Sequence, residues 1–186
     1  IADDIRDCVT SDFKQEGNLV YLVGRQTEQE LGGSEYYAAM GREGGRVPKT
    51  EPAVLKQAME GLLKCMKNHC IVACHDCSEG GLGVCLAEMA IGGDQGANID
   101  VIRVGEQLRT DFKIFSESNT RWVVEVKKVK QDDFEKTLKK ELVPFFLLGI
   151  VQGKQLVIHD KGKTVVDLAV DKLREWWRKP IWGRMG

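Results

Sequence analysis

The chain has 186 residues, with 27 Lys and Arg against 28 Asp and Glu, so that 27 − 28 gives a formal net charge of −1. Hydrophobic residues make up 42% and charged residues 30%, which are ordinary values for a globular protein and exclude a disordered or fibrous one. The balanced charge gives no electrostatic basis for binding nucleic acid or an anionic membrane. The longest apolar run, residues 143–151, is too short for a membrane span of about 20 residues, so we expect no membrane association.

We expect one domain over residues 1–186, since a chain of this length usually folds around a single core. The sequence begins at Ile1 rather than at an initiator Met. It also lacks the charged segment and apolar stretch that mark a secretory signal. We therefore expect a processed form or a fragment of a longer protein.

The six cysteines are expected to be free thiols in a cytoplasmic protein. Cys65, Cys70, Cys74 and Cys85 lie in periodic apolar segments, where Cys often serves as a small hydrophobic residue. Cys74 and Cys77 form a C-x-x-C pair. A zinc site would need a second pair at ligand spacing, and a redox motif would need a thioredoxin-like context. The sequence supplies neither, so both uses are disfavoured.

The first elements follow from apolar patterns and capping residues. Residues 19–23 are an apolar run between turns and predict a strand. Ser34 is placed to cap a short helix, and the glycine-rich residues 41–49 predict a loop. Thr50 supplies a capping hydroxyl for the next helix, with Pro52 in its first turn. That helix has one apolar stripe, formed by Leu55, Ala58, Met59, Leu62, Leu63 and Met66.

The middle of the chain predicts a buried strand followed by a helix. Residues 71–74 are continuously apolar, as in a strand buried on both faces of a sheet. A polar, glycine-rich segment at residues 75–81 comes next. The helix after it has an apolar stripe and stops at Gly92 and Gly93.

The rest of the chain predicts a run of strands and two more helices. The strands are expected at residues 97–101, 122–126, 145–151, 155–159 and 163–170, and the helices at 131–142 and after a capping Asp171. Strands and helices alternate at first, but the chain then runs through several strands in succession. This order predicts an α+β fold, with a layered mixed β-sheet and packed helices, rather than a purely parallel doubly wound sheet.

The segment at residues 75–81 is the strongest candidate site. It lies between a buried strand and a helix, where backbone N–H groups and the helix dipole favour an anion. Gly80 and Gly81 allow close approach to a nucleotide phosphate, and Ser78 can donate to a phosphate oxygen. Asp76 is the candidate metal ligand, because Mg²⁺ prefers oxygen donors and bridges to phosphate oxygens. The alternative, equally favoured by spacing, is a helix cap with turn glycines.

A second polar segment, residues 116–121, lies between two apolar runs. It contains a carboxylate, a hydroxyl, an amide and a guanidinium, on Glu117, Ser118, Asn119 and Arg121. Together these groups could bind a phosphorylated or polyhydroxylated ligand. The alternative, which spacing alone favours, is a hairpin or strand connection built from turn-favouring side chains.

These segments resemble those of one enzyme family, in order and spacing. Residues 75–82 read HDCSEGGL, residues 86–90 read LAEMA, residues 115–121 read FSESNTR and residues 31–36 read LGGSEY. They resemble the H-D-x-S-[DE]-G-G-L…L-A-E-M-A, F-S-E-S-x-x-R and L-G-G-S-E-Y segments of phosphoribosylformylglycinamidine synthase. The chain is similar to the last of four structural units of that enzyme. This unit is like the C-terminal domain of aminoimidazole ribonucleotide (AIR) synthase and related to ferredoxin-like topology.

The resemblance implies a part of an ATP-dependent ligase of purine biosynthesis. The full enzyme would convert formylglycinamide ribonucleotide (FGAR) to the amidine with ATP and Mg²⁺ as cofactors. Its partners would be the remaining domains of the synthetase and a glutaminase subunit or domain that supplies ammonia. Asp76 and Ser78 would contribute to a pseudosymmetric, auxiliary magnesium–nucleotide site, and no residue of this chain would be catalytic. Asn119 and Thr120 replace the Gln and Glu of the family's substrate-binding loop.

Two other interpretations stay open from the sequence. The chain could be a domain of another ATP-dependent kinase or synthetase of the AIR synthase superfamily, or a stand-alone nucleotide-binding module without catalysis. The reading frame upstream of Ile1 would separate these possibilities.

Overall fold

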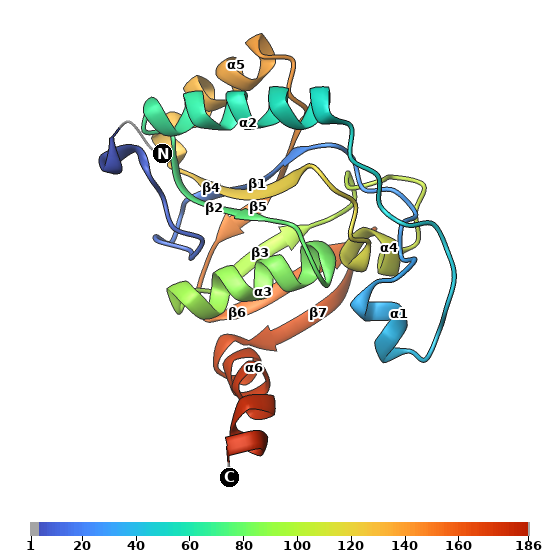
Figure 1. Cartoon of the computed structure of the whole chain (residues 1–186). Helices are drawn as coiled ribbons and strands as arrows, with labels where there is room; N and C mark the ends of the chain where they lie inside the picture. Colours follow the sequence, from blue (N-terminus) through green and yellow to red (C-terminus); the bar gives the residue numbers. More distant parts are fainter. Residues whose placement is uncertain (1–3, 186) are drawn as a thin grey trace.

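The computed structural model describes residues 4–185, and Ile1 lies outside this range. The fold is a seven-stranded β-sheet with helices packed on both of its faces (Figure 1). The strands are β1 (Leu19–Gly24), β2 (Ile71–Asp76), β3 (Ala97–Asp100), β4 (Arg121–Val126), β5 (Phe145–Val151), β6 (Gln155–Asp160) and β7 (Lys163–Ala169). The helices are α1 (Glu35–Ala39), α2 (Pro52–Lys67), α3 (Gly81–Gly93), α4 (Thr110–Phe115), α5 (Gln131–Lys140) and α6 (Val170–Met185), with short 3₁₀ turns at Ile5–Asp7 and Lys128–Lys130.

The sheet is mixed, with the strand order β2-β4-β1-β5-β3-β6-β7. Neighbouring strands are antiparallel except β3 and β6, which are parallel. The predicted α+β fold is therefore confirmed. The three predicted strands β5, β6 and β7 are present, but β5 and β6 do not pair, because β3 lies between them. Gly96 permits this insertion, since a Cβ atom there would lie 2.2 Å from the carbonyl oxygen of Gln155.

Strand β1 is buried on both faces and separates two apolar cores. On one face, Tyr21 packs against Phe134 of α5, with ring centroids 4.9 Å apart, beneath α2 and α5. On the other face, Leu22 belongs to the core beneath α3, together with Leu86 and Met89. Burying each such side chain contributes roughly 1.5–3 kcal/mol. The continuous apolar sequence of β1 follows from this position between two helical layers.

Helix α2 begins at Pro52 as predicted, but the predicted cap is wrong. Glu51 is the N-cap residue, and its side chain makes no capping hydrogen bond. The Thr50 hydroxyl instead accepts a hydrogen bond from the side-chain amide of Asn119, at 2.8 Å. The buried stripe of α2 is also narrower than predicted, because Met59 and Leu63 are exposed.

Helix α4 was not predicted from the sequence. It includes the apolar run that precedes residues 116–121 and is six residues long. Six residues are too few for apolar side chains to recur at a recognisable helical spacing. The polar segment therefore connects helix α4 to strand β4, and the hairpin between two strands that was one alternative is wrong.

The segment before β1 is held by the buried carboxylate of Glu125 on β4. This carboxylate accepts hydrogen bonds from the backbone N–H groups of Lys14, at 2.7 Å, and Gln15, at 3.0 Å. The side-chain amide of Asn18 donates a third, at 2.6 Å. Phe13 lies in the core beneath α3. The chain is thus firmly packed ahead of its first strand.

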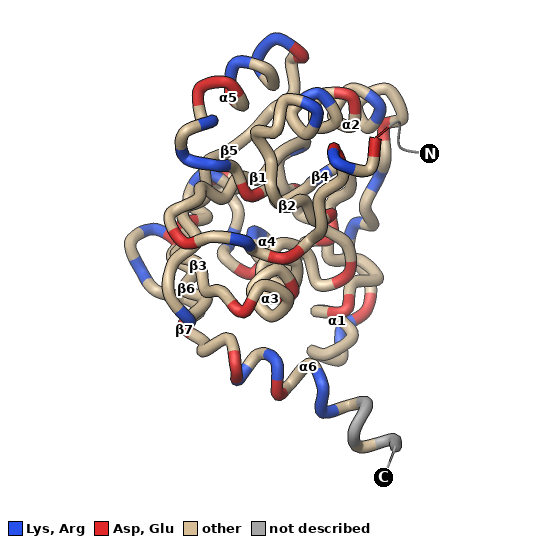
Figure 2. The backbone as a smooth tube through the Cα atoms, turned by 90° about the vertical axis from the view of Figure 1, so that its left-hand side faces the viewer, with Lys and Arg blue, Asp and Glu red and all other residues tan. Residues whose placement is uncertain are grey.

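Lysines and acids are interspersed on the surface helices (Figure 2). On α5, Lys139 lies 3.3 Å from Glu135, and just before the helix Lys130 lies 3.0 Å from Asp133. The lysines at residues 127–140 thus lie mostly on an exposed face, and Lys130 and Lys139 are paired with acidic side chains. In the described part of the chain, no helix combines the length and apolar character that crossing a membrane requires.

All six cysteines fall within residues 4–185 and are free thiols. Cys8 is exposed and Cys74 is half-buried, whereas Cys65, Cys70, Cys77 and Cys85 are buried. Burial raises the pKa of both Cys65 and Cys74 to about 12. These two thiols therefore stay protonated near neutral pH and make poor nucleophiles.

Candidate functional site

The candidate site is the turn between β2 and α3, at the edge of the sheet. Asp76 is the last residue of β2, and its side chain is 65% exposed. The Ser78 hydroxyl donates a hydrogen bond to the Asp76 carboxylate. This hydrogen bond is the main reason that the pKa of Asp76 is lowered below its ordinary value. Neither residue caps α3, because the N-cap is Gly80, in a left-handed conformation with φ of +75°.

The N–H groups of the two turn glycines are already used within the protein. Gly80 donates to a carboxylate oxygen of Glu117, at 2.8 Å, and Gly81 donates to the carbonyl oxygen of Ser78, at 3.0 Å. A Cβ atom on Gly81 would lie 2.5 Å from the carbonyl oxygen of Ser116. The glycines therefore allow close packing of the turn on residues 114–116, and their N–H groups are not open to a phosphate in this structure.

Residues 116–121 form a largely buried segment, held by internal hydrogen bonds, rather than an open loop. The guanidinium of Arg121 is 1% exposed and donates to the carbonyl oxygens of Ser116, at 2.6 Å, and Ser118, at 2.7 Å. It also donates to the hydroxyl of Thr27, at 2.5 Å. Burial lowers the pKa of Arg121. The hydroxyl of Ser118 accepts from the N–H of Glu28, at 3.1 Å, so Arg121 and Ser118 both act in holding the fold.

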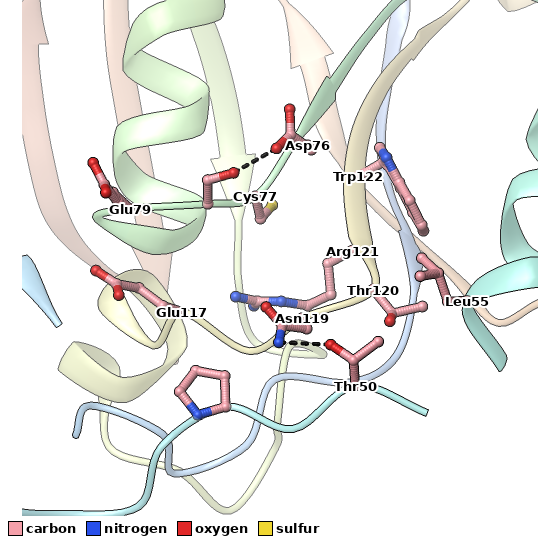
Figure 3. A pocket seen from close by; sticks show the side chains of 12 residues that line it. Thr50, Leu55, Asp76, Cys77, Glu79, Glu117, Asn119, Thr120, Arg121 and Trp122 are labelled. Carbon is pink, nitrogen blue, oxygen red and sulfur yellow. Dashed lines mark hydrogen bonds between the residues drawn. The ribbon is translucent and has the colours of Figure 1, made fainter. Parts of the chain in front are cut away.

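A cavity of about 550 Å³ opens beside the Asp76 turn. Its polar lining includes Asp76, Ser78, Glu79, Glu117, Asn119, Thr120 and Arg121, and its apolar lining includes Pro48, Leu55 and Trp122. Glu79 and Glu117 lie on the side opposite Leu55 and Trp122 (Figure 3). Thr120 is 6% exposed, and its hydroxyl has no hydrogen-bond partner. This hydroxyl is therefore a buried, unpaired polar group in the lining of the cavity.

The structure thus brings together most of the predicted site residues. Five of them share the cavity lining, namely Asp76, Ser78, Glu117, Asn119 and Arg121, whereas Gly80, Gly81 and Ser118 are not part of it. Sequence analysis missed a further group of lining residues: Pro48, Thr50, Leu55, Glu79, Thr120 and Trp122. They come from three separate segments of the chain, and only their nearness to the two motifs in sequence could have suggested Glu79 and Thr120.

His75 ties β2 to α3 and forms no catalytic constellation. Its Nε2 atom lies 3.2 Å from a carboxylate oxygen of Glu88 on α3. Its Nδ1 atom lies 3.5 Å from Asp76 and makes no hydrogen bond. Within the described residues, no group of three or more His, Cys, Asp or Glu side chains is arranged to hold a metal ion.

The comparison with known sequences places the chain in a family. Residues 15–161 match the family described as AIR synthase related protein, C-terminal domain. This match covers most of the chain, and the chain belongs to that family.

Relatives with curated functions are about four times as long. The chain is 35% identical over 179 residues to phosphoribosylformylglycinamidine synthase subunit PurL of Alkaliphilus metalliredigens, covering 96% of this chain and 24% of that protein. It is also 35% identical over 182 residues to the PurL subunit of Caldanaerobacter subterraneus, with coverage of 97% and 24%. The chain thus spans about a quarter of the length of these relatives.

Solved structures confirm the fold. Thermotoga maritima PurL complexed with FGAR matches with a TM-score of 0.80 and 18% identity, over 90% of this chain and 29% of that one. The same protein complexed with ATP matches with a TM-score of 0.73, also at 18% identity, over 89% and 27%. A thiamine-monophosphate kinase from Stenotrophomonas maltophilia gives a lower TM-score of 0.55 at 15% identity, over 84% and 54%.

Proposed function

We propose that this chain is the part of a phosphoribosylformylglycinamidine synthase that supplies an auxiliary magnesium–nucleotide site. The curated relatives at 35% identity carry this enzyme name, and structures of matching fold were solved with ATP and with FGAR. A domain of another kinase in the superfamily is a weaker candidate, since the kinase structure matches with a TM-score of 0.55 against 0.80.

The exposed pair of Asp76 and Ser78 is the observation that carries this proposal. The Asp76 carboxylate has a lowered pKa, lies at the mouth of the cavity and is not used as a helix cap. A single protein carboxylate fits Mg²⁺, which in nucleotide sites is held by one or two carboxylates, phosphate oxygens and water. Mg²⁺ bound there with ATP would offset the repulsion between phosphate and the acidic lining.

Other residues of the cavity would bind and orient the nucleotide. Asn119 and Thr120 lie beside the turn, and the free hydroxyl of Thr120 can donate to a ligand oxygen. Leu55 and Trp122 form an apolar wall that keeps water from one side of the ligand. None of these residues is given a catalytic role.

The proposed reaction of the complete enzyme follows from the enzyme name. The γ-phosphoryl group of ATP would be transferred to the glycinamide carbonyl oxygen of FGAR, which releases ADP. Ammonia from a glutaminase partner then adds to the activated carbon, and phosphate leaves to give the amidine. The remaining domains of the synthetase would supply the catalytic groups, and the assembly would act in the cytoplasm. The isolated chain should therefore form no amidine from FGAR, ATP and ammonia, and turnover by the pure chain would contradict this assignment.

Replacing Asp76 with Asn tests the site, because it preserves the shape of the side chain and removes its charge. We expect affinity for Mg·ATP, measured by calorimetric titration of the 186-residue chain, to fall about tenfold or more, a loss of roughly 1.4 kcal/mol. The melting temperature should change little, since the side chain is mostly exposed. Asp167→Asn is the matched control, because it removes an exposed carboxylate that does not line the cavity. Equal affinity in the two variants would contradict the proposal.

A further inference from the structure

The carboxylate of Glu117 lies at the N-terminus of α3, the end of a helix that favours binding of an anion. One of its oxygens accepts a hydrogen bond from the N–H of Gly80, the N-cap of α3, at 2.8 Å. The same oxygen accepts from the N–H of Glu35, at 3.1 Å. Backbone N–H groups at a helix start favour negative charge, and here a side chain of the same protein supplies that charge.

The loop that carries Glu117 is fixed on both sides. The N–H of Glu117 donates to the carbonyl oxygen of Glu30, at 3.2 Å. The buried guanidinium of Arg121 holds the carbonyl oxygens of the two neighbouring residues, Ser116 and Ser118. The carboxylate is therefore presented to Gly80 by a rigid backbone, and the arrangement does not depend on a freely rotating surface side chain.

This arrangement leaves the cavity poor in groups that attract a bare phosphate. Asp76, Glu79 and Glu117 all line it. Among the described residues that line the cavity, Arg121 is the cation, and its guanidinium is engaged with protein oxygens. A phosphate that enters without a metal ion meets three carboxylates, and the N–H groups of Gly80 and Gly81 are already engaged with protein oxygens. The hydroxyl of Thr120 is an unpaired donor.

We propose that Glu117 is an internal anion that blocks the N–H group at the start of α3, and that it thereby makes phosphate binding in this cavity depend on a divalent cation. The proposal deepens the proposed nucleotide site and rests on it for the identity of the natural ligand. Glu117 is a specificity-determining residue in this scheme: it excludes metal-free polyphosphates and touches no reacting atom.

Three variants separate blocking of the N–H group from a simple effect of charge. Glu117→Ala removes the carboxylate and exposes the Gly80 N–H group. Glu117→Gln removes the charge but keeps an oxygen that can accept the same two hydrogen bonds. Glu79→Gln removes one charge from the same cavity, and Glu79 has no hydrogen bond or ion pair with the residues that the structure describes. The probe is inorganic pyrophosphate in the presence of EDTA, titrated into the 186-residue chain and followed through the amide NMR signal of Gly80.

We expect Glu117→Ala to bind metal-free pyrophosphate about tenfold or more tightly than wild type, the effect of one hydrogen bond to a charged group. Glu117→Gln and Glu79→Gln should each stay within about threefold of wild type, as expected for a partly exposed charge. Equal gains in all three variants would show that charge alone matters and would overturn the proposal. No gain in Glu117→Ala would also overturn it.

A fourth variant guards against misfolding. Glu117→Ser leaves a polar group at this half-buried position, but its hydroxyl is too short to reach Gly80. It should show the same gain and faster hydrogen exchange at the Gly80 amide. The proposed function is tested separately, by Mg·ATP binding to the wild-type chain. If wild type fails to bind Mg·ATP while Glu117→Ala gains pyrophosphate binding, the nucleotide assignment fails and the blocking role of Glu117 stands.

Discussion

Lys113 of α4 and Asp160 of β6 form an ion pair with 2.8 Å between Nζ and Oδ1, and both side chains are excluded from solvent. The Lys113 ammonium also donates to the carbonyl oxygen of Ile102, at 3.2 Å. The hydroxyl of Thr110 donates to the other Asp160 oxygen, at 2.6 Å. One buried carboxylate therefore joins α4, β6 and the loop after β3.

Breaking this ion pair from one side should destabilise the fold strongly. Lys113→Met leaves the Asp160 carboxylate buried without its cation, and we expect a loss of about 3–5 kcal/mol in the free energy of unfolding. Urea denaturation measures it. Lys139→Met, which breaks an exposed ion pair with Glu135, is the control and should cost about 1 kcal/mol or less. A similar small loss for Lys113→Met would mean that the buried pair contributes little.

The same carboxylate should make stability sensitive to acid. Burial alone would raise the pKa of Asp160, but hydrogen bonds from Lys113 and Thr110 outweigh burial and lower the pKa. A carboxyl group with a lowered pKa in the folded state contributes stability above the unfolded pKa of about 3.9. That contribution is lost as the pH falls through the folded pKa.

We therefore expect the free energy of unfolding of the wild type to fall as the pH drops from about 5 to 2. Asp160→Asn should show a smaller fall, because the titrating group is gone. Asp167→Asn, which removes an exposed carboxylate, should keep the wild-type fall. Urea denaturation at a series of pH values measures all three, and parallel curves for wild type and Asp160→Asn would rule out this contribution.

Two glycines with similar backbone angles should differ sharply in their tolerance of Ala. Gly33 has φ of +76°, and a Cβ atom added there would have no other atom within 4 Å. Gly81 has φ of +64°, and a Cβ atom added there would lie 2.5 Å from the Ser116 carbonyl oxygen. Gly33→Ala should cost about 1–2 kcal/mol, the backbone penalty alone. Gly81→Ala should cost at least about 2 kcal/mol more, since overpacking adds to that penalty. Thermal denaturation measures both, and equal losses would show that the close approach at Gly81 is not restrictive.

Thiol reactivity should follow burial. In the native protein we expect Cys8 to react first with a thiol reagent at neutral pH, because it is exposed. Cys65 and Cys74 should react slowly, since burial raises the pKa of each to about 12. In denaturant without reductant all six thiols should titrate. A reproducible shortfall would indicate a disulfide, and fast native reaction of Cys65 would indicate local opening of α2.

The sequence predicts the elements well where burial leaves a local pattern. The apolar run of β1 and the apolar stripe of α2 both follow burial against a core, so both elements were found, although the stripe of α2 overstated how many residues are buried. The pairing of β3 with both β5 and β6 leaves no such pattern, because it depends on contacts between distant segments. Helix α4 is only six residues long, and one of its buried residues is Lys113. A charged residue at a buried position interrupts the apolar pattern by which the helix could have been predicted.

The candidate site was predicted in part for the same reason. The exposed pair of Asp76 and Ser78 could be found because it lies between a strand and a helix that the sequence reveals. The burial of Arg121 could not be found, since its partners include Thr27, which is 94 residues away in the chain. The contact between Glu117 and Gly80 likewise joins two motifs through space, 37 residues apart. The local sequence shows which side chains are polar, but not which of them form hydrogen bonds within the fold and are therefore not open to a ligand.

The hydrogen bonds of Glu125 also have a practical meaning for anyone who divides this protein into pieces. The segment that matches the family, residues 15–161, leaves out Lys14, whose N–H group donates to Glu125, and the buried Phe13. At its other end it leaves out Val170, which is buried in the same core. A recombinant piece cut at the family boundaries would expose a buried carboxylate and open that core. The unit that can fold is therefore longer, at both ends, than the segment that matches the family.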